Sequence, residues 1–371
     1  MKCRILACVT ALTLFAALAV NVPARGQDNS QPGLIKFDVP GAGTGSYQGT
    51  QPSAISPNRT VTGFYCDAVN CHGFLRDSAA AITTFDAPED TNGTYPEAIN
   101  PAGAITGNYT DASSVNYGFL RAGDGEITTF DVSEAGTGSG QGTFPGNINT
   151  AGEIAGSYVD GSGVNHGFLR DPDGTITTFD APGAGTGSGQ GTVPFFTDCL
   201  TPAGAVAGYY LDANGVNHGF VRSPEGVITT FQVPGAATGA GQGTVVTGIN
   251  PAGTTAGVWF DANSAAHGYV RAPDGTITKY DVQGAGTGSG QGTAGLAINP
   301  AGEGVSFWID DNSVFHGYLR SPTGAITKYD VPGAGTGAGQ GTWLFDINPA
   351  GSVTGFYVDA SNVYHGFLLI P

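Results

Sequence analysis

The chain has 371 residues, of which 62 are glycine and 22 are proline, and its formal net charge is −17. The excess of acidic residues argues against nucleic acid or an anionic membrane as a partner. A hydrophobic fraction of 40%, with many β-branched and aromatic residues, argues against disorder, so the glycine and proline content indicates short strands joined by tight turns.

The first 33 residues are expected to precede the folded domain. Lys2 and Arg4 stand before an apolar run from Ile5 to Val20, and Val22-Pro23-Ala24 offers small residues before a cleavage point. This pattern predicts a secretory signal over residues 1–24, followed by a short linker over residues 25–33. No later segment is apolar and long enough to cross a bilayer, so we expect an exported protein, extracellular or periplasmic, without membrane insertion.

From residue 34 onwards, one unit of about fifty residues repeats seven times. Its marker is His-Gly-Phe-Leu-Arg or a close variant, which begins at His72, Tyr117, His166, His218, His267, His316 and His365. A second run, Ile-Thr-Thr-Phe-Asp or Ile-Thr-Lys-Tyr-Asp, follows the first six markers but not the seventh. The missing run stands at the other end, as Leu34 to Asp38, which indicates that the two ends together complete one repeat.

Each repeat is predicted to contain four short strands, as the fourth copy illustrates. A first apolar strand ends near Leu200, and the turn that follows it reads Asn-Pro-Ala-Gly in several other copies. Three strands then follow, Val206 to Asp212, Val216 to Arg222 and Val227 to Phe231, with tight turns between them. A glycine-rich segment, which suits crowded backbone crossings, leads to the next copy.

This organisation predicts an all-β fold with a single domain over residues 34–371. Repeats of this length with four strands each are typical of a β-propeller, here with seven four-stranded antiparallel blades. Residues 34–38 would form the outermost strand of the last blade and close the ring, so that no long sheet edge stays open. An open solenoid would also repeat, but it does not require split end copies.

Three cysteines remain after the predicted signal. Cys66 and Cys71 flank a four-residue connection, which a hairpin can bring within disulfide distance in an oxidising compartment. Cys199 stands in an apolar context without a cluster of cysteine or histidine near it, which favours an inert buried thiol over a nucleophile.

The six histidines of the chain all occupy one repeat position, which argues against a single catalytic histidine. If the turn after the third strand sets the expected register, each histidine lies opposite the aspartate that ends the fourth strand. We therefore expect a structural network that holds each blade together, made of His72, His166, His218, His267, His316 and His365 with Asp86, Asp180, Asp281 and Asp330.

The same end of the repeat offers a set of candidate ligand contacts. In each copy an aromatic residue precedes, by two positions, the aspartate that opens the turn into the third strand. Aspartate and asparagine accept hydrogen bonds from hydroxyl groups, and tyrosine or tryptophan can stack on a ligand. The candidate ligand-binding residues are Asp160, Asp212, Asn214, Asp261, Asn263, Asp310, Asn312, Tyr158, Tyr210, Trp259 and Trp308.

No catalytic, cofactor-binding or metal-binding residues are assigned. Calcium is the alternative for the aspartates, but each turn supplies two side chains and no terminal carboxylate. The Gly-x-Gly patterns are followed by strands and not by a helix, which argues against a nucleotide. The arginine of each copy is expected to form exposed ion pairs with turn residues such as Asp171 and Asp173.

Departures from the repeat are the places where a single asymmetric pocket would form. The first crossing, Ala87 to Tyr95, is short and acidic, and Glu97 follows it. The fourth copy carries extra residues around Phe195, Phe196, Asp198 and Cys199, and the last copy carries Trp343 and Asp346. Drift in tolerant loops is the alternative explanation for all of them.

The units His-Gly-Phe-Leu-Arg, Ile-Asn-Pro-Ala-Gly and Gly-x-Tyr-x-Asp together resemble the HAF family of probable extracellular bacterial repeats, named for a His-Ala-Phe core. The resemblance extends from Leu34 to Leu369, and glycine replaces the alanine of the core, for example at Gly73 and Gly167. It implies an exported bacterial repeat protein and brings no catalytic residues.

The sequence as a whole favours a secreted monomer that binds without catalysis or serves as a scaffold. The expected partner is an extracellular glycan or a protein. The rival hypothesis is an extracellular lyase or hydrolase that acts on sugars or lactones at the central channel, and a passive envelope or matrix component is a third.

Overall fold

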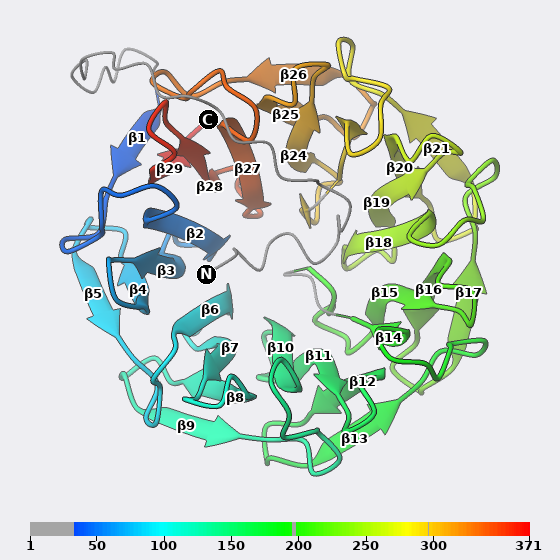
Figure 1. Ribbon diagram of the computed structural model, residues 1–371, viewed down its shortest axis with the longest axis horizontal. Coiled ribbons are helices and arrows are strands. Elements are labelled where there is room, and N and C mark those ends of the chain that lie inside the picture. Colours follow the sequence, from blue (N-terminus) through cyan, green and yellow to red (C-terminus); the bar gives the residue numbers. More distant parts are fainter. Residues whose placement is uncertain (1–32, 195–197, 296) are drawn as a thin grey trace.

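The computed structural model describes residues 33–194, 198–295 and 297–371, and these residues form β-strands and turns without a helix. Within these ranges, no helix exists that could cross a membrane. The strands form antiparallel groups that follow one another along the chain and surround a common axis (Figure 1).

The first three groups are complete four-stranded meanders. Their strands are β2 (Gly49–Ile55), β3 (Val61–Cys66), β4 (Cys71–Arg76) and β5 (Ile82–Phe85); β6 (Thr94–Ile99), β7 (Ile105–Thr110), β8 (Asn116–Arg121) and β9 (Ile127–Phe130); and β10 (Gly142–Ile148), β11 (Ile154–Val159), β12 (Asn165–Arg170) and β13 (Ile176–Phe179).

The following three groups repeat this pattern with a shorter or divided first strand in two of them. Their strands are β14 (Gly191–Val193), β15 (Val206–Leu211), β16 (Asn217–Arg222) and β17 (Ile228–Phe231); β18 (Gly243–Ile249), β19 (Thr255–Phe260), β20 (Ala266–Arg271) and β21 (Ile277–Tyr280); and β22 (Gly292–Thr293), β23 (Ala297–Ile298), β24 (Gly304–Ile309), β25 (Phe315–Arg320) and β26 (Ile326–Tyr329).

The last group joins the two ends of the described chain. It contains β27 (Gly341–Ile347), β28 (Val353–Val358) and β29 (Tyr364–Leu369), and its outer strand is β1 (Leu34–Phe37). β1 pairs antiparallel with β29, with Leu34 opposite Leu369 and Phe37 opposite Gly366. Residues 34–38 therefore take the place of the strand that the seventh copy lacks.

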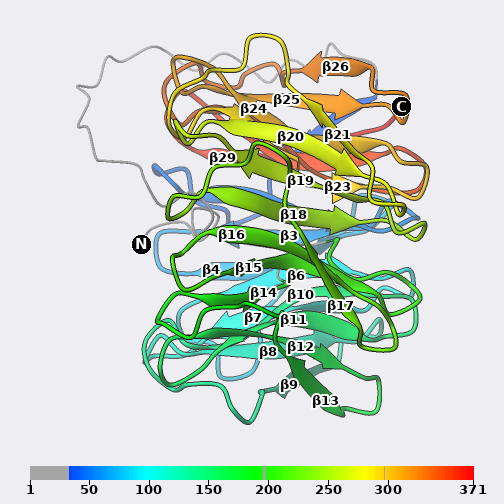
Figure 2. The same cartoon turned by 90° about the vertical axis from the view of Figure 1, so that its right-hand side faces the viewer.

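Neighbouring groups pack face against face, as the side view in Figure 2 shows. At six of these contacts an aromatic ring from the outer strand of one group meets, edge to face, a buried ring from the third strand of the next. The centroids lie 6.0 to 6.3 Å apart, in the pairs Phe37–Phe74, Phe85–Phe119, Phe130–Phe168, Phe179–Phe220, Phe231–Tyr269 and Tyr280–Tyr318. Each buried ring contributes about 1.5–3 kcal/mol, so the aromatic residue of the marker is a packing residue.

The arginines of the repeat lie over these same rings. The guanidinium carbon lies 4.6 to 5.1 Å from the ring centroid in Arg76–Phe37, Arg121–Phe85, Arg170–Phe130, Arg222–Phe179, Arg271–Phe231 and Arg320–Tyr280. Within the described residues none of them forms an ion pair within 4.0 Å, so the expected exposed pairs with Asp171 and Asp173 are wrong. The reason is that the outer strand of the preceding group offers an aromatic ring over which the guanidinium packs.

A belt of asparagine side chains links successive turns near the axis. Asn348, which is 1% exposed, donates from Nδ2 to the carbonyl of Ser56, and its Oδ1 accepts from the amides of Ala350 and Ser352. Asn100, Asn149, Asn250 and Asn299 donate in the same way to the turn of the following group. The asparagine of the Asn-Pro-Ala-Gly turn therefore both shapes its own turn and holds the next group.

The hairpin between β3 and β4 contains a disulfide. Cys66 and Cys71 stand opposite each other in the antiparallel register and are bonded through sulfur, whereas Cys199 is a free, buried thiol. A covalent link at this position fixes the turn in the first group.

Candidate functional site

One end of the ring carries the recurrent histidines and their aspartates, and we call it the histidine face. His166 Nδ1 lies 2.9 Å from Asp180 Oδ1, and His166 Nε2 lies 3.6 Å from Asp160 Oδ2. Gly167 stands opposite Phe179 in the ladder, which is what brings His166 beside Asp180. The same arrangement surrounds His72, His267, His316 and His365. Each of these histidines thus lies between two carboxylates from different turns of its group.

Two copies depart from this arrangement. In the fourth, Gln232 replaces the second aspartate, and His218 Nε2 lies 3.3 Å from Asp212 Oδ2 alone. In the second, Tyr117 stacks on Tyr109 with centroids 5.4 Å apart, and Asp131 accepts a hydrogen bond from Thr143. The face is therefore a ring of similar but unequal units.

The candidate aromatic residues are stacked on the histidines. Centroid distances are 4.9 Å for Tyr158–His166, 4.8 Å for Tyr210–His218, 4.3 Å for Trp259–His267 and 4.2 Å for Trp308–His316. Tyr158, Tyr210 and Trp308 are buried, and Trp259 is half-buried. One face of each ring is thus covered by imidazole.

Lysines lie over two of these aromatic rings and over Tyr357, the equivalent residue of the last copy. Lys279 Nζ lies 4.9 Å from the ring centroid of Trp259, Lys328 Nζ lies 4.7 Å from that of Trp308, and Lys36 Nζ lies 5.3 Å from that of Tyr357. Lys279 also donates to the carbonyl of Pro234 in the preceding crossing, at 2.9 Å. Imidazole and lysine together therefore cover the rings of Trp259 and Trp308, which the sequence suggested as stacking surfaces for a ligand.

The aspartates that open the turns are held by backbone amides. Asp160 Oδ1 accepts from the amides of Ser162 and Val164, both at 2.8 Å. Burial alone would raise the pKa of Asp160, but these amides and His166 outweigh it, so the pKa lies below its ordinary value. Asp212, Asp261 and Asp310 make the same turn. The turn asparagines Asn214, Asn263 and Asn312 are exposed.

The aspartates that follow the outer strands are the more accessible ones. Their side chains are 37 to 56% exposed at Asp38, Asp86, Asp180, Asp281 and Asp330. Histidine Nδ1 holds one side of each carboxylate, so the remaining lone pairs are oriented towards solvent. Within the described residues, no group of three or more His, Cys, Asp or Glu side chains is placed to hold a metal ion.

A second polar cluster lies among the inner strands and joins Asp198 with Asp346. Asp346 in β27 accepts hydrogen bonds from the amides of Ile55 and Ile347, each at 2.7 Å, and is 7% exposed. Asp198 Oδ2 accepts from the amide of Ile298 at 3.0 Å, and its backbone carbonyl accepts from Ile249. The two aspartates therefore connect inner strands that are far apart in the sequence.

The environment of this pair disfavours ionisation. Burial raises the pKa of Asp346 to about 6. The hydrogen bonds from the amides of Ile55 and Ile347 lower this pKa, but burial outweighs them. Desolvation and repulsion by Asp346 raise the pKa of Asp198 well above its ordinary value, although Asp198 keeps some contact with solvent. Because Asp346 receives two amide hydrogen bonds and Asp198 receives one, the charged form of Asp198 is the more strongly disfavoured of the two.

The other departures from the repeat that the structure describes include Trp343, Glu97 and Cys199. Trp343 is buried and stacks on Phe315 with centroids 4.0 Å apart, and Glu97 is half-buried in β6. Cys199 is buried, and burial raises the pKa of its thiol, so the thiolate is disfavoured. Phe195 and Phe196 lie outside the described residues. Sequence reasoning named Asp198 and Asp346 separately, and only the electrostatic interaction between them in the fold reveals a pair.

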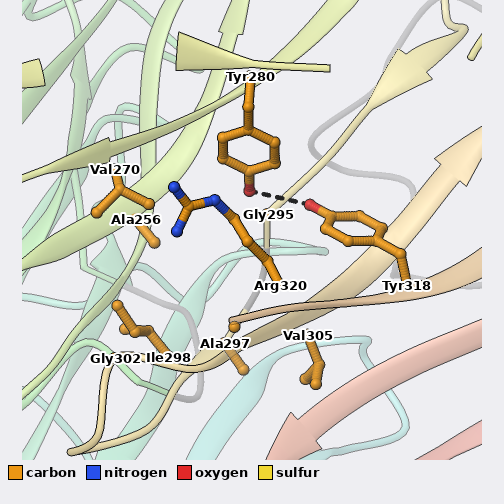
Figure 3. A pocket seen from close by; sticks show the side chains of 11 residues that line it. Ala256, Val270, Tyr280, Gly295, Ala297, Ile298, Gly302, Val305, Tyr318 and Arg320 are labelled. Carbon is orange, nitrogen blue, oxygen red and sulfur yellow. Dashed lines mark hydrogen bonds between the residues drawn. The ribbon is translucent and has the colours of Figure 1, made fainter. Parts of the chain in front are cut away.

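A small cavity between β20 and β25 is lined by Tyr280, Tyr318 and Arg320 among others (Figure 3). The two tyrosine hydroxyls lie 3.0 Å apart. Its volume of about 10 Å³ is close to that of a single water site, so it is a packing void and no ligand site.

No protein-family model matches the chain, and no curated protein matches it. Among solved structures, the chain is similar to a streptogramin B lyase, with a TM-score of 0.56 and 15% identity over 91% of this chain and 97% of that chain. It is also similar to the BP39L lectin from Burkholderia pseudomallei, with a TM-score of 0.51 and 10% identity over 84% of this chain and 92% of that chain. At these identities the likeness shows the propeller-like fold alone.

Proposed function

We propose that the chain is an exported, seven-bladed propeller that binds an extracellular glycan or a protein partner through its histidine face. The blade number follows from counting each strand group as one blade, in agreement with seven sequence repeats. Export is supported by the signal pattern of residues 1–24, and the resemblance to HAF repeats agrees with it. The protein acts as a monomer without a bound cofactor.

The observation that carries the proposal is the set of oriented, half-exposed carboxylates on this face. Asp86, Asp180, Asp281 and Asp330 are 51 to 56% exposed, and each lies within hydrogen-bond distance of a histidine Nδ1. A side chain already held in one orientation loses little conformational freedom on binding. Each carboxylate offers free lone pairs to hydroxyl or ammonium donors.

The contacts of this face are polar, because the aromatic rings are covered. Exposed turn residues Asn214, Asn263 and Asn312 add amide donors and acceptors beside the carboxylates. Similar units around one ring engage a long ligand at several points, so that weak single contacts add up to a useful affinity. A chain with hydroxyl groups at regular spacing fits this surface, and so does a basic protein segment.

A glycan array with the chain from residue 25 onwards tests the proposal. The variant carries Asp180→Asn, Asp281→Asn and Asp330→Asn, which removes three charges but keeps an acceptor for each histidine. The control carries Asp173→Asn, Asp274→Asn and Glu225→Gln in the turns of the opposite face. We expect saturable binding that the first variant weakens by roughly tenfold or more and the control leaves unchanged. Absence of binding to any glycan, cation or secreted protein would contradict the proposal.

A second candidate function is catalysis by a lyase or hydrolase on sugars or lactones near the axis. The observation that favours it is that Asp198 and Asp346 both have raised pKa values. A carboxyl group with a raised pKa can serve as a general acid. Turnover assays on the ligands from the array separate the two functions. Product formation that Asp198→Asn abolishes supports catalysis, and binding without turnover supports the first proposal.

A further inference from the structure

The end of the ring opposite the histidine face contains a cavity of about 250 Å³ at the junction of the first and last repeats. We call it the junction cavity. Its walls come from β1, from the end of β29 and from two turns of the first strand group. The lining residues are Ile35, Leu368 and Ile370, the arginines Arg59 and Arg76, and the turn residues Ser78 to Ala80. The cavity therefore combines apolar walls with two guanidinium groups.

The turn that carries Arg59 differs from its counterparts. It reads Ser56-Pro57-Asn58-Arg59, whereas other copies read Asn-Pro-Ala-Gly. Arg59 adopts a φ of 67°, and the glycines at the same position, such as Gly103 and Gly302, have a φ of 81°. A left-handed conformation is unfavourable for arginine, so this copy tolerates backbone strain in order to place a guanidinium beside the cavity.

The second turn has lost the acidic residue of its counterparts. Asp124, Asp173, Glu225 and Asp274 occupy one position in the turn between the third and fourth strands. Ala79 stands there in the first copy, where it lines the cavity beside Arg76. The acidic residue of this turn is instead Asp77, directly after Arg76, and its charge acts on Arg76.

Neither guanidinium is in ion-pair contact with an acid in the described part of the chain, although the charge of Asp77 acts on Arg76. Arg76 is 6% exposed and lies over the Phe37 ring, with 5.1 Å between the guanidinium carbon and the centroid. Arg121, Arg170, Arg222 and Arg320 donate from Nη1 to the carbonyl of the next residue. No such bond is made by Arg76, and among the described residues no carboxylate oxygen lies within 4.0 Å of Arg76 or Arg59. The nearby Asp77 is engaged through Oδ1 by the amide of Ala81.

We propose that the junction cavity binds a small organic carboxylate that bears a short apolar group. A carboxylate matches the planar fork of arginine, and the pairing is strong where water is partly excluded. The walls formed by Ile35, Leu368 and Ile370 would cover the apolar group. The volume is below the range of about 300–1,000 Å³ that is usual for drug-sized ligands, so the ligand is small.

Titration with benzoate, followed by the amide NMR signals of Ser78, Ala79 and Ala80, tests this proposal. Benzamide is the probe without charge, and acetate is the probe without a large apolar group. Two variants are used. Arg59→Gly introduces the glycine that the other copies have at this position, and Ala79→Asp introduces the acidic residue that four other copies have at the equivalent position. Thr323→Asp is the matched control, because it makes the same kind of change at the same turn position in the sixth copy.

We expect saturable benzoate binding in the millimolar range, with benzamide and acetate each roughly tenfold weaker. Arg59→Gly and Ala79→Asp should each weaken benzoate by roughly tenfold or more, and Thr323→Asp should not. Glycine is native at this turn position in six copies, so Arg59→Gly is expected to fold. The proposal is overturned if benzoate does not saturate, if benzamide binds equally well, or if Arg59→Gly binds as the unaltered protein does. These outcomes do not depend on the carboxylates of the histidine face.

Discussion

A histidine of the repeat performs three structural tasks at once. His365 stacks on Tyr357 with centroids 4.9 Å apart, and its Nδ1 lies 3.0 Å from Asp38 and its Nε2 3.7 Å from Asp359. Burial lowers the pKa of His365, but the hydrogen bond and charge of Asp38 outweigh it and raise the pKa overall. A side chain held on three sides is suited to orienting carboxylates and poorly suited to moving protons.

The Asp198 and Asp346 pair predicts how stability depends on pH. Both carboxyl groups have a higher pKa in the folded chain than the ordinary value of 3.8, so they bind protons more tightly when folded. Their stabilisation is complete below about pH 4 and is lost as the pH rises through the raised pKa of each group, which is about 6 for Asp346. Asp198→Asn should therefore gain about 1–3 kcal/mol of unfolding free energy over the unaltered chain between pH 4 and pH 8.

Denaturant unfolding at several pH values measures this difference. The asparagine keeps the acceptor for the amide of Ile298, so the hydrogen bond itself is not lost. Asp173→Asn is the control, because Asp173 is exposed and its pKa is lowered, chiefly by the Thr175 amide. The control should leave the profile from pH 5 to 8 unchanged. Parallel profiles for Asp198→Asn and the unaltered chain would refute the assignment of the proton to this pair.

At the scale of the element, the glycine that precedes each inner strand determines the backbone path from the glycine-rich crossing into the next strand group. Gly191 has a φ of 107°, and a Cβ there would lie 2.0 Å from the carbonyl oxygen of Asn165. Thr192 follows and accepts from the amide of Ala181 through Oγ1, which fixes the crossing to the inner strand. The Gly-Thr pair therefore sets the start of the inner strand, whereas Gly189, two residues earlier, has no atom within 4 Å of an added Cβ.

Two substitutions in one crossing separate these roles. Gly191→Ala should lower the unfolding free energy by at least about 3 kcal/mol, because the backbone carbonyl of Asn165 cannot move aside cheaply. Gly189→Ala should cost only about 1 kcal/mol, since its φ is 79° but no atom lies within 4 Å of the added Cβ. Chemical denaturation of both variants provides the comparison. Equal losses would show that backbone conformation, and not the close approach to Asn165, limits both positions.

Turns and strand register could be predicted from the sequence because both depend on local spacing. The Asp-Gly turn brings His166 beside Asp180, at 2.9 Å, and the spacing of Cys66 and Cys71 places them opposite each other in a hairpin. The covering of Trp259 by Lys279 could not be predicted in this way, because the carbonyl that positions the lysine belongs to Pro234 in the preceding crossing. The stacking of each arginine on a ring of the preceding group has the same origin.

At the scale of the whole molecule, several of the interactions that sequence reasoning missed join different groups. Asp198 and Asp346 lie in different repeats, and the electrostatic interaction between them depends on the curvature of the entire ring. The junction cavity forms only where the first and last repeats meet, so neither repeat shows it alone. Closure itself could be predicted, since the run from Leu34 to Asp38 is the strand that the seventh copy lacks.

Closure makes the two ends of the described chain depend on each other, and this dependence can be measured. Leu34 is 5% exposed in β1 and stands opposite Leu369 of β29, whereas the neighbouring Ile35 is 36% exposed. Leu34→Ala should lower the local stability of the β1–β29 pair by about 2–3 kcal/mol, and Ile35→Ala should lower it by less than about 1 kcal/mol.

Amide hydrogen exchange detected by mass spectrometry locates the effect. In Leu34→Ala, peptides covering Tyr364–Leu369 should exchange roughly thirtyfold faster, because β29 loses its outer partner each time β1 opens. Peptides covering Ile127–Phe130, in the strand group that lies two groups along the ring from β1, should exchange as before (Figure 1). Ile35→Ala serves as the matched control and should leave both regions close to the unaltered rates. If the carboxyl-terminal peptides do not respond to Leu34→Ala, or if β9 responds equally, the two ends do not close the ring through β1.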